Sequence, residues 1–263
     1  MKKIELLKKS DKAEIPAGSS KLKNKNIHQK AFTLAEVLIT LGVIGIVAAL
    51  TIPNLMGAYR KKVVETRLAR FSSVINQAIR RSEVDNESVE YWGPNLISTA
   101  INDEDGKPSG NYSSNALEWY NRYLAPYLSV LRVEEVNTQE QRVLVYFTDG
   151  SLLNFSSRSW LFYPDAKYYD EVEKEGALND RDRSECGRRY FTFQLYTKSN
   201  NSNVKISGGV YPFAQFLNIP AEKLKTDSAL GCTKEIPTNE RAYCTLLIAE
   251  NGWKIPKDYP LKF

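Results

Sequence analysis

One carboxylate interrupts a long apolar run near the start of the chain. Residues 30–53 read KAFTLAEVLITLGVIGIVAALTIP, and after Lys30 the only charged residue among them is Glu36. A carboxyl group without a partner in hydrocarbon is costly, so acids inside membranes usually have a partner and a function. Glu36 therefore predicts an ion pair inside the membrane. The alternative is a side chain that reaches the cytoplasmic headgroup layer.

The apolar run is long enough to cross a bilayer. Residues 32–52 would span ~31 Å as a helix, about the thickness of the hydrocarbon core. Residues 1–31 carry nine lysines and three acidic residues, a net charge of +6, whereas the other 232 residues sum to −1. Lysines keep their end of a span in the cytoplasm, which predicts an extracytoplasmic remainder. A secretory signal has a shorter apolar region and an A-x-A-like cleavage site, which does not occur here.

The residues around Glu36 resemble the N-terminal signature of the type IV pilin and type II secretion pseudopilin superfamily. That signature is a basic leader, a small residue that is nearly always Gly, then F-T-L-x-E and an apolar helix. The matching residues are Lys30, Ala31, Phe32, Thr33, Leu34 and Glu36. The chain departs from the signature at Ala31, which stands where the family prefers Gly.

The resemblance implies steps of processing and assembly. A prepilin peptidase would cut between Ala31 and Phe32, remove the leader 1–31 and methylate the Phe32 amine. Pro53 would kink the helix. In a filament of staggered subunits, Glu36 of one subunit would pair with the Phe32 amine of a neighbour, so that two charges that are costly in an apolar environment satisfy each other.

Three cysteines lie in the part expected outside the membrane, where disulfides persist: Cys186, Cys232 and Cys244. The sequence alone allows three single pairings. The resemblance favours Cys232 with Cys244, because pilin-like proteins often carry a disulfide in their C-terminal region. Cys186 would then be left over.

The resemblance also raises calcium as a ligand, since some major pseudopilins bind it in a loop near the C-terminal strands. The acidic segment 164–185 occupies a comparable region and contains oxygen donors of the kind that calcium prefers: Asp165, Asp170, Asp180, Asp182 and Glu185. Arginines interleave with these acids, so a solvated loop is the alternative. We assign no metal ligand and no cofactor.

Catalysis has little support in the sequence. The only histidine, His28, lies in the leader, so the remainder offers no imidazole for acid–base or nucleophilic catalysis. Motifs such as G-x-S-x-G, C-x-x-C and H-E-x-x-H do not occur. Paired carboxylates could form a glycosidase site, but no spacing singles out a pair. We therefore expect a protein that is not an enzyme. The net charge outside the leader also does not favour nucleic acid as a partner.

The elements that carry these residues follow from periodicity. After Pro53, apolar residues recur every three or four positions, with charged residues between them. This predicts one helix over about 33–84, which would span the membrane over 32–52 and be amphipathic over 54–84. Residues 85–141 read as a turn-rich connecting region with one short helix, which Asn115 and Glu118 would cap.

Strand patterns begin at Arg142. Two alternating runs flank Asp149-Gly150, which predicts a hairpin, and residues 188–198 alternate as another strand. Residues 242–256 predict a further strand, a turn at Asn251-Gly252 and a short return. Residues 142–263 would thus form an antiparallel sheet. The expected fold is α+β and pilin-like, with the long N-terminal helix packed on a C-terminal sheet.

Together these features predict a prepilin-like structural subunit, processed by prepilin peptidase and assembled into a type IV pilus or type II secretion pseudopilus. Its partners would be copies of itself or other pilin-like subunits, the peptidase, an inner-membrane assembly platform and the lipid bilayer. It would reside in the inner membrane and later in a filament in the periplasm or at the cell surface. The alternative is a single-pass, membrane-anchored extracytoplasmic enzyme or binding protein that forms no filament and keeps its leader.

Overall fold

The computed structural model describes residues 32–137, 141–157, 159–173, 183–197 and 208–263. The chain divides into two compact units, Met1–Ala49 and Leu50–Phe263. The leader 1–31, including Ala31, lies outside the described residues.

The first element, helix α1, covers Leu34–Asp85. The predicted helix over about 33–84 is therefore confirmed, and its assignment runs through Pro53 without a break. Among the described residues it is the one helix that is long and apolar enough to cross a membrane, and its most apolar stretch is not buried within the chain. The kink expected at Pro53 stays a prediction.

The later part of α1 buries one apolar stripe. Its members recur at three- and four-residue steps, as an amphipathic helix requires. They are Val64, Leu68, Phe71, Ile75, Ala78 and Ile79. Phe71 stacks on Phe162 with 4.3 Å between ring centroids and meets Phe193 edge-on at 4.8 Å. The stripe therefore packs directly on the sheet of the second unit.

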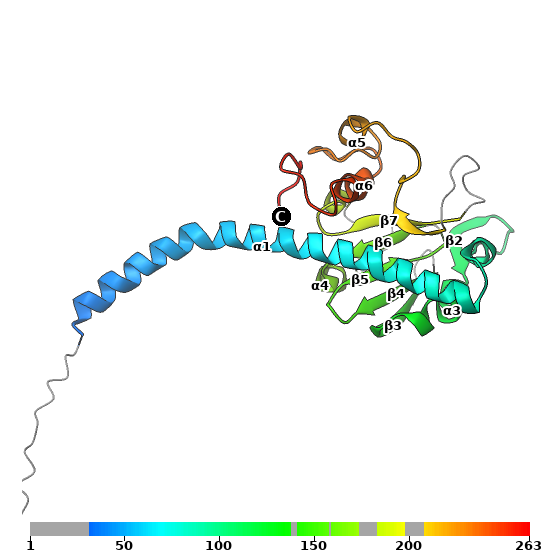
Figure 1. Ribbon diagram of the computed structural model, residues 1–263, viewed down its shortest axis with the longest axis horizontal. Helices are drawn as coiled ribbons and strands as arrows, with labels where there is room; N and C mark the ends of the chain where they lie inside the picture. Colours follow the sequence, from blue (N-terminus) through cyan, green and yellow to red (C-terminus); the bar gives the residue numbers. More distant parts are fainter. Residues whose placement is uncertain (1–31, 138–140, 158, 174–182, 198–207) are drawn as a thin grey trace, which may run out of the picture. The chain divides into compact units, whose positions relative to one another are not determined.

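This sheet has six antiparallel strands in the order β3-β4-β5-β6-β7-β8, so every strand pairs with its neighbour in sequence (Figure 1). The strands are β3 (Val130–Asn137), β4 (Gln141–Phe147), β5 (Leu152–Phe155), β6 (Trp160–Tyr163), β7 (Phe191–Tyr196) and β8 (Gly209–Pro212). Both faces of the central strands are buried. In β4, Val143 and Val145 belong to the same core cluster as α1, whereas Leu144 and Tyr146 belong to a second cluster with Cys186.

Shorter elements complete the second unit. The helices are α2 (Val89–Trp92), η1 (Gly93–Asn95), α3 (Ala116–Tyr123), η2 (Ala125–Tyr127), α4 (Ala166–Tyr168), η3 (Tyr169–Glu173), η5 (Arg183–Glu185), α5 (Lys223–Thr226) and α6 (Tyr243–Glu250). A separate hairpin pairs β1 (Ser98–Asn102) with β2 (Pro108–Ser114). The α+β class and the packing of a long helix on an antiparallel sheet are confirmed.

Three of the expected strands are present where the sequence placed them, namely β4, β5 and β7. Tyr146 pairs with Leu152 across the loop that contains Asp149-Gly150, and Gly150 adopts φ +81°, which favours glycine. The alternating run 188–198 contains β7. The sheet begins earlier than Arg142, however, because β3 lies in the region expected to be only a connection.

The strand expected in residues 242–256 was wrong, because this segment contains helix α6. Every residue from Tyr243 to Ile248 is buried, so the run is apolar on all sides and its periodicity cannot separate a helix from a strand. Asn251-Gly252 ends the helix. Gly252 N donates to the Ala249 carbonyl (3.0 Å) and Trp253 N to the Ile248 carbonyl (2.9 Å), which is the Schellman arrangement, with Gly252 at φ +64°.

The short helix expected in the connecting region is α3, but its predicted capping box is not formed. The Asn115 side chain makes no capping bond. Its Oδ1 accepts the Ile97 amide (2.9 Å), and its Nδ2 donates to the Asn95 carbonyl (2.7 Å). In the first turn of α3, the Ala116 amide donates instead to Ser114 Oγ (3.2 Å).

Candidate processing and assembly site

The residues at the start of α1 form a reciprocal capping arrangement. Thr33 N and Thr33 Oγ1 each donate to Glu36 Oε2 at 2.9 Å, and Glu36 N donates to Thr33 Oγ1 at 3.2 Å. This is the capping box that T-x-x-E favours, with the carboxylate in the first turn, where the helix dipole stabilises an anion. The sequence T-L-A-E therefore begins the helix as well as supplying a charge.

The capping box leaves part of Glu36 available. Both bonds from Thr33 use Oε2, and within the described part of the chain Oε1 accepts no hydrogen bond. The neighbouring Phe32 side chain is 85% exposed. The structure thus presents one carboxylate oxygen and one exposed aromatic side chain at the start of the helix. The cleavage site at Ala31 and Phe32 and the pairing of Glu36 with a neighbour stay predictions.

The disulfide expected between Cys232 and Cys244 is present, with the two Cα atoms 4.7 Å apart. It joins the segment after α5 to the first turn of α6. Cys186 is buried and does not take part in this disulfide. The next residue, Gly187, packs against this disulfide, because a Cβ atom placed on Gly187 would be 2.5 Å from Cys244 Sγ.

Glu65 connects α1 to residues 254–255, and sequence reasoning missed this role. Its side chain is on the packed side of α1, with the residue only 8% exposed. Glu65 Oε1 accepts the Ile255 amide at 3.0 Å, and Oε2 lies 3.3 Å from Lys254 Nζ. The available signal was its position beside Val64 on the apolar stripe, where a carboxylate needs a partner.

The carboxylates that the structure describes in the acidic segment 164–185 have separate partners. Asp165 caps α4, and Asp170 accepts the Tyr146 hydroxyl (2.5 Å) and faces Arg132 (3.6 Å). Glu185 pairs with Arg188 and, at 3.8 Å, with Arg189. Among the described residues no group of three potential metal ligands occurs, and Asp180 and Asp182 lie outside those residues.

Two buried tyrosines in the second unit, Tyr120 and Tyr146, have raised pKa values. Burial, and next the hydrogen bond to Asp170, raise the pKa of Tyr146. Burial raises the pKa of Tyr120 to about 12, and its hydroxyl has no hydrogen-bond partner among the described residues. Neither group can act as a base near neutral pH.

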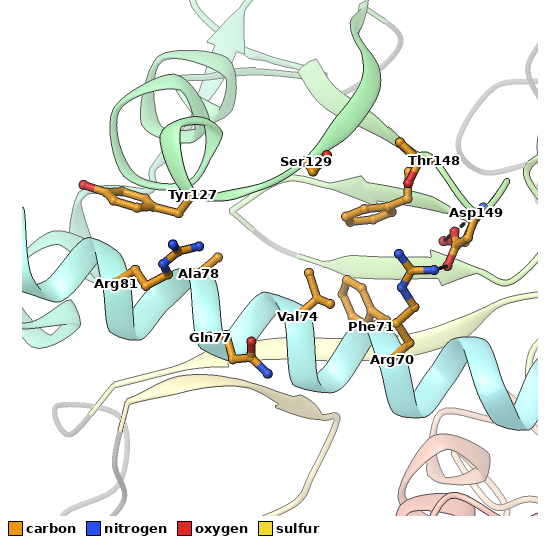
Figure 2. Close-up of a pocket in the computed structure, with 12 residues that line it drawn as sticks. Arg70, Phe71, Val74, Gln77, Ala78, Arg81, Tyr127, Ser129, Thr148 and Asp149 are labelled. Atoms are coloured by element: carbon orange, nitrogen blue, oxygen red, sulfur yellow. Dashed lines mark hydrogen bonds and ion pairs between the residues drawn. The ribbon is translucent and has the colours of Figure 1, made fainter.

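A cavity of about 210 Å³ lies beside α1 (Figure 2). Figure 2 shows Phe71 and Val74 at its floor, with Arg70 and Arg81 near its two ends. Arg70 Nη1 forms an ion pair with Asp149 Oδ2 at 3.4 Å. The described residues that line this cavity include neither histidine nor cysteine.

Comparisons with known proteins divide the chain at Pro53. Residues 26–52 match the model of the prokaryotic N-terminal methylation motif, the prepilin signature of type IV pilins and pseudopilins. Residues 54–263 match the model of a family of unknown function, DUF6613. The comparisons with curated proteins and with solved structures give no match. The chain therefore belongs to the DUF6613 family and carries a prepilin-type N-terminal methylation motif ahead of the domain that defines this family.

Proposed function

We propose that the chain is a prepilin-like structural subunit of a type IV pilus or type II secretion pseudopilus. The observation that carries this proposal is the F-T-L-A-E sequence of residues 32–36 at the start of an apolar helix, within the matched methylation motif. The absence of histidine after the leader agrees with a structural role. Prepilin peptidase would cut between Ala31 and Phe32 and methylate the new amine.

Glu36 would then direct assembly. Thr33 orients the carboxylate through Oε2, which leaves Oε1 for the Phe32 amine of a neighbouring subunit. An amine and a carboxylate that are each costly in an apolar environment become one satisfied pair, and the pair specifies the axial stagger. Before assembly, residues 32–52 would hold the subunit in the inner membrane as a single-pass anchor.

Processing is the first test. The full chain is expressed with an active prepilin peptidase or with an inactivated one, and intact mass and N-terminal sequence are measured. We expect a chain that begins at Phe32 and is one methyl group heavier only with the active peptidase. Ala31→Gly serves as a positive control because it restores the residue that the signature prefers. A chain that still begins at Met1 beside a processed Ala31→Gly control would contradict processing of the natural sequence.

Assembly is the second test. Glu36→Ala should leave membrane insertion and leader removal intact but abolish incorporation into filaments, because it leaves the neighbour's amine unpaired. Glu36→Asp is the matched variant, since it keeps the charge on a shorter side chain. Incorporation is measured by cross-linking two differently tagged copies in membranes. Normal incorporation of Glu36→Ala would contradict the assembly role of Glu36, whereas failure of the parent chain itself to incorporate would favour the alternative, a membrane-anchored protein that forms no filament.

A further inference from the structure

A second cavity in the unit Leu50–Phe263 has a strongly cationic lining. It measures about 350 Å³ and lies between α1 and the segments that follow β6 and precede β7. Its cationic residues are Arg60, Arg67, Lys167, Arg188 and Arg189. Among the described residues, Asp165 is the one acidic residue that lines it. We call this cavity the basic groove.

Part of this charge is held in place by the protein. The Arg67 guanidinium donates to the carbonyl oxygens of Pro164 and Asp149, which fixes its position without neutralising it. Arg188 and Arg189 share a single carboxylate, Glu185. With Asp165 and Glu185 set against the five cations, these seven side chains sum to a net charge of +3.

Two of the cations are available to a ligand. Arg60 and Lys167 are exposed, and neither side chain forms a hydrogen bond or ion pair with the described residues. They lie on different elements, α1 and α4, that both line the groove. An anion between them would gain contacts that neither residue makes within the chain.

The rest of the lining is apolar. Met56 and Tyr59 are exposed large side chains on α1, and Val63 and Phe263 continue the same lining. Phe263 approaches the helix closely, because a Cβ atom placed on Gly57 would be 3.2 Å from the backbone oxygen of Phe263. A matching ligand therefore combines an anionic group with a short apolar portion.

The place of the groove along the chain identifies a source for such a ligand. Met56 and Arg60 follow Ile52, the last residue of the expected span, by four and eight residues. At 1.5 Å per residue, Arg60 lies ~12 Å along α1 beyond the span. The headgroup layer extends about 5–8 Å beyond the hydrocarbon on each side, and arginine and lysine side chains are long enough to reach back into it.

We propose that the basic groove binds the phosphodiester headgroup of an anionic phospholipid. Arg60 and Lys167 contact the phosphate, and Met56 and Tyr59 contact the first methylene groups of the lipid. The proposal rests on membrane insertion of residues 32–52, which is part of the proposed function. It adds a lipid contact that keeps the second unit at the bilayer surface before assembly.

The test uses the full chain in lipid nanodiscs that contain either phosphatidylglycerol or phosphatidylcholine. Lipid that remains bound is counted by native mass spectrometry. The variant is Arg60→Gln with Lys167→Gln, and the control is Arg81→Gln with Lys107→Gln, which removes the same charge from two exposed residues outside the groove. We expect the variant to retain about tenfold less phosphatidylglycerol, and the control to match the parent chain.

A charge-preserving variant and a phosphate control complete the test. Arg60→Lys with Lys167→Arg preserves the charges and should restore retention. Equal retention of the two lipids, or equal loss in variant and control, would overturn the proposal. A further measurement adds inorganic phosphate to the parent chain in neutral detergent. If phosphate stabilises the chain against unfolding while phosphatidylglycerol is not retained in nanodiscs, the groove binds a soluble anion and the lipid assignment is wrong. Leader removal is measured on the same variants, so failure of lipid binding is distinguished from failure of processing.

Discussion

Replacing Glu65 by alanine should release the segment around Lys254 and Ile255 from α1. Glu65 Oε1 accepts the Ile255 amide at 3.0 Å, and Ile255 is buried, so the variant leaves a buried N–H without a partner. A hydrogen bond to a charged acceptor contributes about 1.5–3 kcal/mol. The contact with Lys254 adds little, because its side chain is 57% exposed and the ion pair is screened by solvent. We therefore expect Glu65→Ala to lower the free energy of unfolding by about 2–3 kcal/mol.

Matched variants separate the two contacts of Glu65. Glu65→Gln keeps an oxygen for the Ile255 amide and should cost about 1 kcal/mol, and Lys254→Gln should cost less than that. The assay is denaturant unfolding of the full chain in detergent, followed by amide hydrogen exchange at Ile255. Exchange should accelerate strongly in Glu65→Ala and weakly in Lys254→Gln. Equal exchange rates in the alanine and glutamine variants would refute the reasoning. The hydrogen bond from the Ile255 amide to residue 65 would then contribute nothing to the loss of stability.

Three further predictions follow from single side chains. Hydrogen bonds from two backbone amides lower the pKa of Asp227 in the folded state. The ionised Asp227 therefore stabilises the fold fully above the unfolded pKa of ~3.9, and this stabilisation is lost as the pH falls through the lower folded pKa. Asp227→Asn should accordingly flatten the acid limb of a stability–pH curve below about pH 4. Tyr120→Phe should raise the free energy of unfolding by about 1 kcal/mol, because it removes a buried hydroxyl without a partner; a loss of stability in denaturant unfolding would contradict this. Thr33→Val should speed amide exchange in the first turn of α1, whereas Thr33→Ser keeps the bonds to Glu36 and should not.

Several features could be predicted because they depend on neighbours in sequence. The turn at Gly150 needs a positive φ, the apolar stripe of α1 repeats with the helical period, and β7 alternates between its two faces. The segment of α6 could not be assigned in this way. Every residue from Tyr243 to Ile248 is buried, so the segment shows no exposed polar face from which a helical or a strand period could be read.

Of the two candidate sites, one could be recognised from neighbouring residues and the other could not. The site at residues 32–36 can be recognised from neighbouring residues alone, because neither a capping box nor a carboxylate in an apolar helix depends on a distant segment. The basic groove brings Arg60 together with Lys167 and Arg189, which lie more than a hundred residues away. No local pattern marks such a set, so the sequence showed only that charged residues alternate with the apolar stripe of α1.

The sequence by itself determined the apolar helix, the methylation motif at its start and the α+β class, because hydrophobic period and short motifs act over a few residues. Only the tertiary structure decided that Glu65 is bound to Ile255, that β3 joins the sheet, and that residues 243–250 are helical. The physical reason is that burial and hydrogen bonding between distant segments compete with local preference, and where the local pattern is ambiguous the distant contacts prevail.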